Sequence, residues 1–305
     1  MNEPNRNQFH RLTFGNSCAT YFAATRPAFL TGSLLPVVTA LTLVWSERGE
    51  LDLSLAMLTL ISIALIHSGA NVLNDYFDAR NGSDAINESR IFPFSGGSRF
   101  IQNGVLSETQ MFRFGSTLLL LGVGLGVAMA VITGPFLLFI GILGALLAFF
   151  YSAPPCLACH GLGDITIGLC FGVLPVTGTV FIQTGKIAPN SLWLGGVIAC
   201  YVCAILWVNS IPDIAADGKV GKRTWPVRLG AQVAAYGLGV WFGVGFLILI
   251  FSPLPTSTWL ALLAIAPAAK ATMSAIGGEM LPAIRLTLIT QAAVCLLLVG
   301  GLVVA

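Results

Sequence analysis

Nine long apolar runs restrict what this chain can fold into. Each has about 17 to 24 residues and few charges, the length an α-helix needs to cross a bilayer. They lie at approximately residues 27–46, 53–76, 115–133, 135–151, 164–184, 190–212, 231–251, 257–273 and 284–304. Only 9% of the 305 residues are charged, too few to cover a soluble domain. The runs also lack the alternation of membrane β-strands. We therefore predict one all-α integral membrane domain over residues 1–305, with nine transmembrane helices in contact with the lipid bilayer.

The basic residues are divided unequally between the two ends of these helices. With nine spans, 13 of the 15 Lys and Arg residues fall on the side of the N-terminus, and only Arg48 and Lys186 on the other. Membrane loops rich in Lys and Arg stay in the cytoplasm. We therefore expect a multi-pass protein of the cell inner (cytoplasmic) membrane with its N-terminus and polar loops in the cytoplasm. The polar stretch before the first run has no small-residue cleavage site, so no removed signal peptide is expected.

The sequence CLACH at 156–160 matches the attachment motif of c-type haem. The predicted orientation places this loop in the cytoplasm, where thiols stay reduced, whereas c-type haem is attached on the opposite side. We therefore predict no haem and interpret the motif as a chance loop sequence. The net formal charge of +2 gives no reason to expect a nucleic-acid partner.

Two polar segments on the predicted cytoplasmic side begin where a predicted helix ends. In the first, four polar residues recur at helical spacing: Asn71, Asn74, Asp75 and Asp78. They share one face of a helix with 3.6 residues per turn. A further acid, Asp84, follows six residues after the last of them.

The second polar segment repeats part of this pattern. Asn209, Asp213 and Asp217 share one helix face if the helix continues past Pro212. The spacing Asn-x-x-x-Asp occurs in both segments, as a weak internal repeat. Four crossings separate the segments, so both reach the same surface of the membrane.

Acidic side chains at the edge of the hydrocarbon are costly, and two acidic helix ends repel each other unless a cation lies between them. Carboxylates suit Mg²⁺ or Ca²⁺, and Mg²⁺ takes one or two of them together with phosphate oxygens of a substrate. Four basic residues follow the acids: Arg80, Arg99, Lys222 and Arg223. The pattern predicts a site for a metal-bound diphosphate. A single Asp at a helix end is more often a solvated cap, but two clusters with matched Asn spacing favour the metal site.

The sequence resembles the UbiA-type superfamily of intramembrane aromatic prenyltransferases. The segments NDYFDARNGSD (74–84) and DIAADGKVGKRTWPVRLG (213–230) are similar to its two aspartate-rich motifs. The resemblance extends to TRPAFLTGSLLPV (25–37), FYSAPP (150–155) and GLGDITIGLCFGVLPVTGTVFIQTG (161–185). Together these segments cover most of the chain and are far more specific than either acidic cluster alone.

Within the superfamily the chain looks most like the 1,4-dihydroxy-2-naphthoate polyprenyltransferases of menaquinone synthesis. The spacing from Asp78 to Asp84 through Gly82 favours that branch, as do RFIQNGVLS (99–107) and GTVFIQTG (178–185). The 4-hydroxybenzoate branch has a basic residue a few positions after the tyrosine that matches Tyr151, and this chain has none. The segment FPFSGGS at 92–98 departs from the naphthoate branch.

The resemblance implies a helix bundle around a central cavity, a polyprenyl diphosphate donor, an aromatic acid acceptor and Mg²⁺. It implies that the metal ligands are Asp75, Asp78, Asp84, Asp213 and Asp217. It implies that the diphosphate is bound by Arg80, Arg99, Lys222, Arg223, Asn71, Asn74 and Asn209. Tyr151 would join the four motif aspartates (75, 78, 213 and 217) in catalysis by orienting or stabilising an allylic cation. The alternative for Tyr151 is a residue of the membrane interface.

Three rival functions remain open. The first is the same chemistry on another acceptor, such as homogentisate, 4-hydroxybenzoate or a chlorophyll precursor. The second is a diphosphate-dependent cyclase with no separate acceptor. The third is a cation transporter. Transporter sites usually lie near the membrane midplane at broken helices, whereas these acids lie at helix ends beside basic loops, which favours phosphate binding.

Overall fold

The computed structural model describes residues 3–5 and 14–305, and this part of the chain is helical with no strand. Within these described residues, eight helices are long and apolar enough to cross a membrane. They cover Pro27–Arg48, Leu53–Asn81, Glu108–Thr133, Gly163–Thr184, Pro189–Ser210, Ala231–Phe251, Thr256–Ile276 and Met280–Val303. Their main elements are α3 (Thr31–Arg48), α4 (Leu53–Asn81), α6 (Glu108–Thr133), α8 (Gly163–Gly168), α9 (Leu174–Thr184), α10 (Pro189–Ser210), α13 (Ala231–Phe251), α14 (Ile265–Ile276) and α15 (Met280–Val303). Short 3-10 turns at Pro27–Phe29 and Thr256–Ala264 lead into α3 and α14.

The prediction of an all-α membrane protein is confirmed, and each of the nine apolar runs is helical. The ninth element is α7 (Phe136–Phe150), which has 15 residues. A helix of that length extends only about 22 Å, less than the ~30 Å of a bilayer's hydrocarbon core. The nine predicted spans are therefore eight full-length helices and one short one in the described part of the chain.

Local sequence signals explain where two helices differ from the predicted runs. The helix α6 begins seven residues before the apolar run, because Ser107 and Gln110 form a capping box. The Ser107 hydroxyl accepts from the Gln110 backbone N–H, and the Gln110 side chain accepts from that of Ser107. An additional helix, α2 (Phe14–Ala24), lies in the polar stretch before the first run and was not predicted.

The fifth apolar run is interrupted in the middle. A π-helical turn, Leu169–Val173, separates α8 from α9. Pro175, in the first turn of α9, has no N–H to continue the α-helical hydrogen bonds of the preceding turn. Single π turns of this kind are common at functional sites, and here Cys170 and Phe171 of the turn line the central cavity.

Close contact between α4 and α6 fixes the helix that carries the first acidic segment. A Cβ at Gly69 would lie 2.7 Å from the backbone nitrogen of Leu119, and one at Gly122 would lie 2.8 Å from the Ser62 carbonyl oxygen. Small residues let membrane helices approach in this way. The Ser62 hydroxyl also donates to the Gly122 carbonyl at 2.8 Å.

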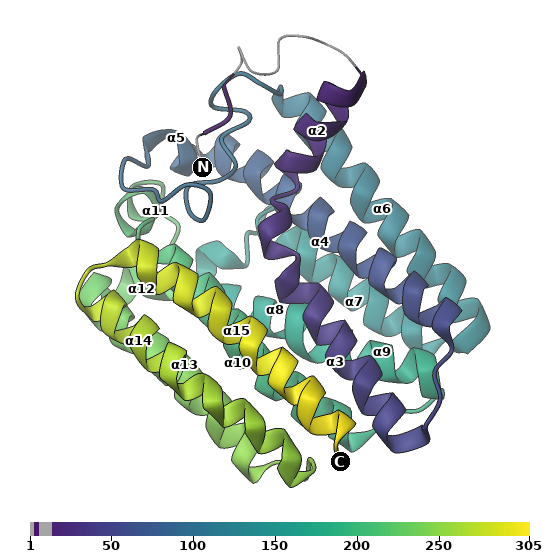
Figure 1. Ribbon diagram of the computed structural model, residues 1–305. Coiled ribbons are helices and arrows are strands. Elements are labelled where there is room, and N and C mark those ends of the chain that lie inside the picture. Colours follow the sequence, from purple (N-terminus) through teal and green to yellow (C-terminus); the bar gives the residue numbers. More distant parts are fainter. Residues whose placement is uncertain (1–2, 6–13) are drawn as a thin grey trace.

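The largest buried cluster lies among α3, α9, α10, α13 and α15. Large apolar side chains also face outward, with Val131 84% and Phe251 75% exposed, as expected of helices that face lipid. The short helices α5 (Ser83–Ile86) and α11 (Ile214–Lys219) lie together at one end of the bundle, and the C-terminus lies at the other (Figure 1). The connections that follow the two acidic segments are therefore neighbours in space.

Candidate active site

A cavity of about 310 Å³ lies between α3, α4, α6, α7, α9 and α10. Its wall is mostly apolar, and its acidic residues gather where α4 and α10 end. The charged and amide residues that line this end are Arg26, Asn71, Asn74, Asp78, Asp84, Asn87, Asn209, Asp213, Asp217 and Lys222. The two acidic segments therefore meet at one end of a single apolar cavity.

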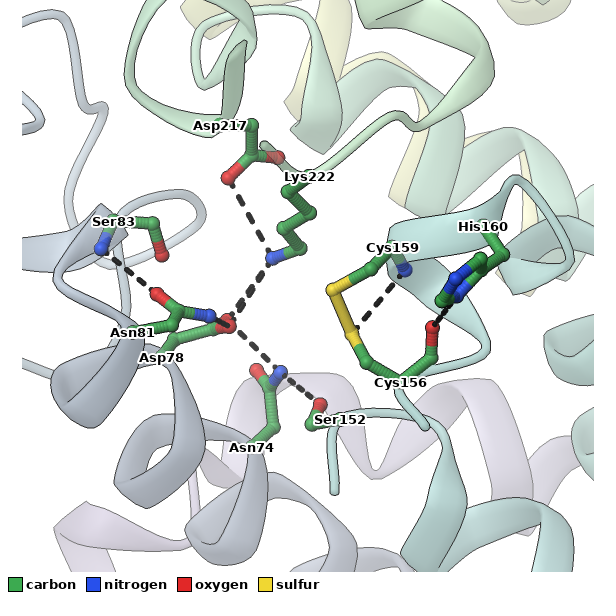
Figure 2. The surroundings of a disulfide bond; sticks show 10 residues. All are labelled: Asn74, Asp78, Asn81, Ser83, Ser152, Cys156, Cys159, His160, Asp217 and Lys222. Atoms are coloured by element: carbon green, nitrogen blue, oxygen red, sulfur yellow. Dashed lines mark hydrogen bonds and ion pairs between the residues drawn. A yellow bond between two sulfur atoms is a disulfide. The ribbon is translucent and has the colours of Figure 1, made fainter. Parts of the chain in front are cut away.

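Asp78 is the most highly connected acid of this site. Its carboxylate accepts from Asn74 Nδ2 at 3.0 Å, from Asn81 Nδ2 at 3.1 Å and from Lys222 Nζ at 3.2 Å. Asn74 also donates to the Ser152 hydroxyl at 2.8 Å, which ties α4 to the loop after α7 (Figure 2). Asn74 and Asp78 lie four residues apart on one helix face, as the sequence predicted.

Lys222 joins the two acidic segments. Its Nζ lies 3.2 Å from Asp78 Oδ1 and 3.6 Å from Asp217 Oδ1 (Figure 2). Burial opposes the charged form, but the carboxylates of Asp78 and Asp217 outweigh it and raise the pKa of Lys222. The ammonium group therefore stays charged and is the cation between the two acidic helix ends.

The acids nonetheless outnumber the positive charge near them. Burial, together with the nearby carboxylates of Asp78 and Asp75, raises the pKa of Asp84 to about 8. Burial likewise raises the pKa of Asp217 to about 7 and raises that of Asp213. A divalent cation would relieve this excess of carboxylates, and hard carboxylate oxygens are the donors that Mg²⁺ prefers.

The acidic residues fit a magnesium ion that is completed by substrate oxygens. No three acidic, His or Cys side chains converge to form a closed metal cage in the part of the chain that the structure describes. Magnesium commonly takes only one or two carboxylates and fills its other positions with water and phosphate oxygens. The arrangement therefore suits a metal that arrives with a diphosphate better than a permanent structural ion.

Asp75 lies behind the cavity wall and is 3% exposed. One carboxylate oxygen accepts from the Ser98 backbone N–H at 3.2 Å. The other has no hydrogen-bond partner in the described residues and lies 3.7 Å from an Arg26 guanidinium nitrogen. Arg26 itself lines the cavity and donates to the carbonyls of Pro93 and Phe94. A buried carboxylate oxygen without a hydrogen bond is costly and is often explained by an ion or a ligand.

The segment 92–98, which departs from the resemblance, folds over the acids. Gly97 has φ +74, and a Cβ there would lie 2.2 Å from Asp84 Oδ2 and 3.3 Å from Asp75 Oδ1. Only glycine lets the backbone pass so close to the two carboxylates. Asn87, shortly before this segment, donates to Asp213 Oδ1 at 2.6 Å and so connects the two acidic segments a second time.

The sixth helix does not continue past Pro212, so the condition for one shared helix face is not met. The helix α10 ends at Ser210, and Asp213 precedes the separate short helix α11. Pro212 has no N–H with which to continue the ladder. Asp213 and Asp217 still lie one turn apart, because the Asp217 N–H donates to the Asp213 carbonyl at 2.8 Å. Asn209 stays on α10, and its amide oxygen has no partner among the described residues.

Comparison with known proteins identifies the family. The model of the UbiA prenyltransferase family matches residues 33–277. This chain belongs to that family. A 1,4-dihydroxy-2-naphthoate octaprenyltransferase of Bacillus subtilis (strain 168) is 29% identical over 228 residues, which is 73% of this chain and 70% of that protein. The enzyme of the same name from Escherichia coli (strain K12) is 30% identical over 217 residues, or 69% of this chain and 68% of that protein. The human UbiA prenyltransferase domain-containing protein 1 is 25% identical over 233 residues, covering 74% and 66%.

Solved structures show the same UbiA fold. A UbiA homolog from Archaeoglobus fulgidus bound to GPP and Mg²⁺ superposes with a TM-score of 0.62 at 15% identity, covering 93% of this chain and 98% of that one. An apo UbiA homolog from Aeropyrum pernix K1 superposes with a TM-score of 0.64 at 17% identity, covering 92% and 98%. The chain is therefore a membrane-embedded prenyltransferase with the fold expected from its sequence.

Three predicted basic residues of this UbiA-family enzyme do not line the cavity. Arg80 is bonded to the Tyr76 hydroxyl at 2.9 Å on the outside of α4. The Arg99 side chain donates to the Asp84 carbonyl, which fixes the loop behind the acids. The Arg223 side chain is exposed. Tyr151, at the C-terminal end of α7, does line the cavity.

Arg26, Asn87 and Ser98 are neighbours of the acids that the sequence did not single out. Arg26 was counted only as a basic residue at the membrane edge. Two signals were available: Arg26 comes directly before the Pro27 that opens the first span, and Ser98 follows a Gly-Gly pair that permits close backbone approach. Neither signal says which acid each residue contacts, because those contacts join segments distant in sequence.

The CLACH loop differs from its prediction. Cys156 and Cys159 form a disulfide, whereas we expected reduced thiols. The turn places their Cα atoms 5.2 Å apart, within the range that a disulfide spans. The Cys159 carbonyl accepts from the Arg223 N–H at 2.9 Å, so this loop holds the residue next to Lys222.

Proposed function

We propose that this UbiA-family enzyme transfers a polyprenyl group from its diphosphate to 1,4-dihydroxy-2-naphthoate. One observation carries the proposal: two acidic segments and a partly buried lysine meet at the polar end of an otherwise apolar cavity. The names of the relatives from B. subtilis and E. coli support the acceptor.

The polar end would bind the diphosphate. Mg²⁺ held by aspartates of the two acidic segments would neutralise the charge that develops on the leaving diphosphate. Lys222 supplies charge-assisted hydrogen bonds from the same place. The amides of Asn71, Asn74 and Asn209 line this end and offer donors to phosphate oxygens.

The apolar part of the cavity would hold the prenyl chain and keep water away. Loss of diphosphate leaves an allylic cation, which water would destroy by hydrolysis. The wall beside α7 and α9 is built from side chains such as Leu138, Ile142 and Leu174. The ring of Tyr151 lies where the apolar and polar parts meet and would orient or stabilise the cation.

The acceptor would attack through the ring carbon that carries the carboxylate. A bond forms between this carbon and C1 of the prenyl group, diphosphate leaves, and the carboxylate departs as CO₂. Purified enzyme with Mg²⁺ and a polyprenyl diphosphate should convert 1,4-dihydroxy-2-naphthoate, with the product identified by mass. Turnover of 4-hydroxybenzoate or homogentisate, with none of the naphthoate, would assign a different acceptor.

We also propose that the acidic segments face the cytoplasm, because most basic residues lie on their side. Exposed Ser89 and Lys186 lie on opposite predicted sides. Single cysteines at these positions, in a variant free of other cysteines, can be labelled from outside whole cells with an impermeant thiol reagent. We expect labelling at 186 and protection at 89, and the reverse pattern would invert the topology.

A further inference from the structure

A polar pair lies deeper in the cavity than the acids, and the proposed reaction does not use it. His67 on α4 lines the cavity and is 6% exposed. Its Nδ1 lies 2.8 Å from the hydroxyl of Ser33 on α3, which is 1% exposed. Polar side chains this deep in a membrane bundle are costly and usually functional. The pair therefore needs an explanation beyond packing.

The hydrogen bond of this pair can run in either direction, and the direction sets the role of Nε2. The Ser33 hydroxyl also lies 3.1 Å from the Leu30 carbonyl oxygen, which accepts from it. When the hydroxyl proton is donated to that carbonyl, Ser33 Oγ accepts from His67 and the ring proton is on Nδ1. An unpaired charge is too costly here, so the ring is neutral. Nε2 then carries a lone pair, and no side chain or backbone group of the described residues donates to it.

The position of His67 matches the place of the second substrate. His67, Asn71, Asn74 and Asp78 recur at helical spacing along the cavity side of α4. Asn71 lies about one turn, or ~6 Å, above His67, and Asp78 about three turns, or ~16 Å. A diphosphate bound at the acids would place the carbon that it leaves near the level of Asn71. A ring that attacks this carbon then lies within reach of His67.

The surroundings of His67 suit a flat aromatic ring. The imidazole packs edge-on against Phe171, with ring centroids 4.6 Å apart. Phe29 and Phe94, which are 6.2 Å apart and edge-to-face, also line the cavity. A prenyl chain has no hydrogen-bond donor for Nε2, whereas a hydroxylated aromatic ring has one.

We propose that Nε2 of His67 accepts a hydrogen bond from a ring hydroxyl of the aromatic acceptor and thereby positions the ring for attack. The inference rests on the proposed function and adds a specificity residue to it. Ser33 acts through His67, because it holds the tautomer that leaves Nε2 free to accept. The enzyme then selects acceptors that have a hydroxyl at this place, because an acceptor without it leaves Nε2 unpaired.

The test compares His67→Phe with the wild type in purified enzyme, using 1,4-dihydroxy-2-naphthoate and its two monomethyl ethers. The phenyl ring keeps the packing against Phe171 and removes the acceptor nitrogen. With the dihydroxy compound we expect kcat/KM to fall roughly 10- to 100-fold, while KM for the prenyl diphosphate changes less than about twofold. With the ether that blocks the bonded hydroxyl, wild type and variant should be equal. A His67→Gln variant, whose amide oxygen can accept, should recover part of the loss.

Two results would overturn the inference. One is a His67→Phe enzyme with wild-type kcat/KM for the dihydroxy compound. The other is an equal loss on the dihydroxy compound and on both ethers, which would show a structural role. Magnesium-dependent binding of a non-reacting prenyl thiodiphosphate shows that each variant is folded.

If the wild-type enzyme prefers a hydroxylated aromatic acceptor other than the naphthoate, the comparison uses that compound and its methyl ether. If wild type prenylates no hydroxylated aromatic, the proposed function and this inference both fail, whereas a normal wild type with a normal variant refutes the inference alone.

Discussion

The first acidic segment lies on one uninterrupted helix, whereas the second lies on a turn and a short helix. Asp75 and Asp78 belong to α4, which continues to Asn81 and is held by its contact with α6. Asp213 and Asp217 follow the end of α10 at Ser210. The two segments look like repeats in sequence, but only the first is carried by a transmembrane helix.

The hydrogen bonds of the two segments differ in the same way. Asp78 accepts from Asn74 and Asn81 of its own helix. Asp213 accepts instead from Asn87, which follows the first segment in the chain. Asp217 has Lys222 as its ion-pair partner, and Lys222 is shared with Asp78. The first segment is therefore preorganised by its helix, and the second takes its position from the first segment and from Lys222.

Exchange of one acid in each segment is the strongest test of this comparison. The Asp78→Asn and Asp213→Asn variants keep side-chain size and remove one negative charge. Metal assistance is worth several kcal/mol of transition-state stabilisation, so we expect each variant to lose on the order of a hundredfold in turnover and to need more Mg²⁺. EDTA should abolish wild-type activity.

A matched control lies at the other end of the same helix. Asp52 is the N-cap of α4 and accepts from the Leu55 N–H at 2.9 Å. Asn is an equally good cap, so Asp52→Asn should keep normal turnover. If Asp213→Asn behaves like this control while Asp78→Asn is inactive, only the first segment binds the metal.

Removal of Lys222 should have the next largest effect. Lys222→Ala leaves Asp78 and Asp217 facing each other without their shared cation. A hydrogen bond to a charged group contributes about 1.5–3 kcal/mol, so kcat/KM for the prenyl diphosphate should fall roughly tenfold or more. Exposed Lys219 lies in the same segment, and Lys219→Ala should remain near wild type. Equal activity of the two variants would mean that Lys222 does not join the segments.

The magnesium requirement should depend on pH. Burial raises the pKa of Asp217 to about 7 and that of Asp84 to about 8, so both are largely protonated at pH 6 and ionised at pH 9. Mg²⁺ binds the ionised form. The Mg²⁺ concentration needed for half-maximal turnover should therefore fall as pH rises, up to about tenfold per pH unit for each proton displaced, and level off above about pH 9.

Without Mg²⁺, a rise in pH should lower the stability of the folded protein, because the buried carboxyl groups of Asp84 and Asp217 become ionised. A carboxyl whose pKa is raised by folding stabilises the protein below its unfolded pKa, and this contribution is lost as pH rises through the folded pKa. The melting temperature of the metal-free enzyme should fall between about pH 4 and 8. The Asp84→Asn variant should remove the upper part of this change, and an unchanged pH profile in that variant would exclude Asp84 as its source.

The smallest effects are expected at basic residues whose side chains lie outside the cavity. Arg80→Ala and Arg223→Ala should change kcat/KM by less than about twofold, as is usual for exposed side chains. Arg80 follows the acids of the first segment and Arg223 those of the second, so the two variants test both sides of the site. A loss above tenfold at Arg223 alone would show that the second segment moves toward the diphosphate on binding.

The sequence by itself determined the membrane class, the positions of the nine helices and the two acidic segments. These features depend on local properties: the length of apolar runs, and the 3.6-residue period that places Asn74 and Asp78 on one face. Whether α10 continues past Pro212 stayed open at the level of the sequence, although the cause of its end is local. The sequence does not show whether a chain that resumes helical turns after a proline does so as one helix or as two.

Only the tertiary structure decided which residues surround the acids. The contacts of Asp75 with Arg26 and Ser98, and of Asp213 with Asn87, join segments far apart in the chain. Arg80 and Lys222 follow their acids at similar distances in sequence, yet Arg80 lies outside and Lys222 lines the cavity. The proposed role of His67 Nε2 likewise depends on the contact of Nδ1 with Ser33 of another helix. Side-chain direction and partners depend on how separate helices pack, and no local pattern in the chain encodes that packing.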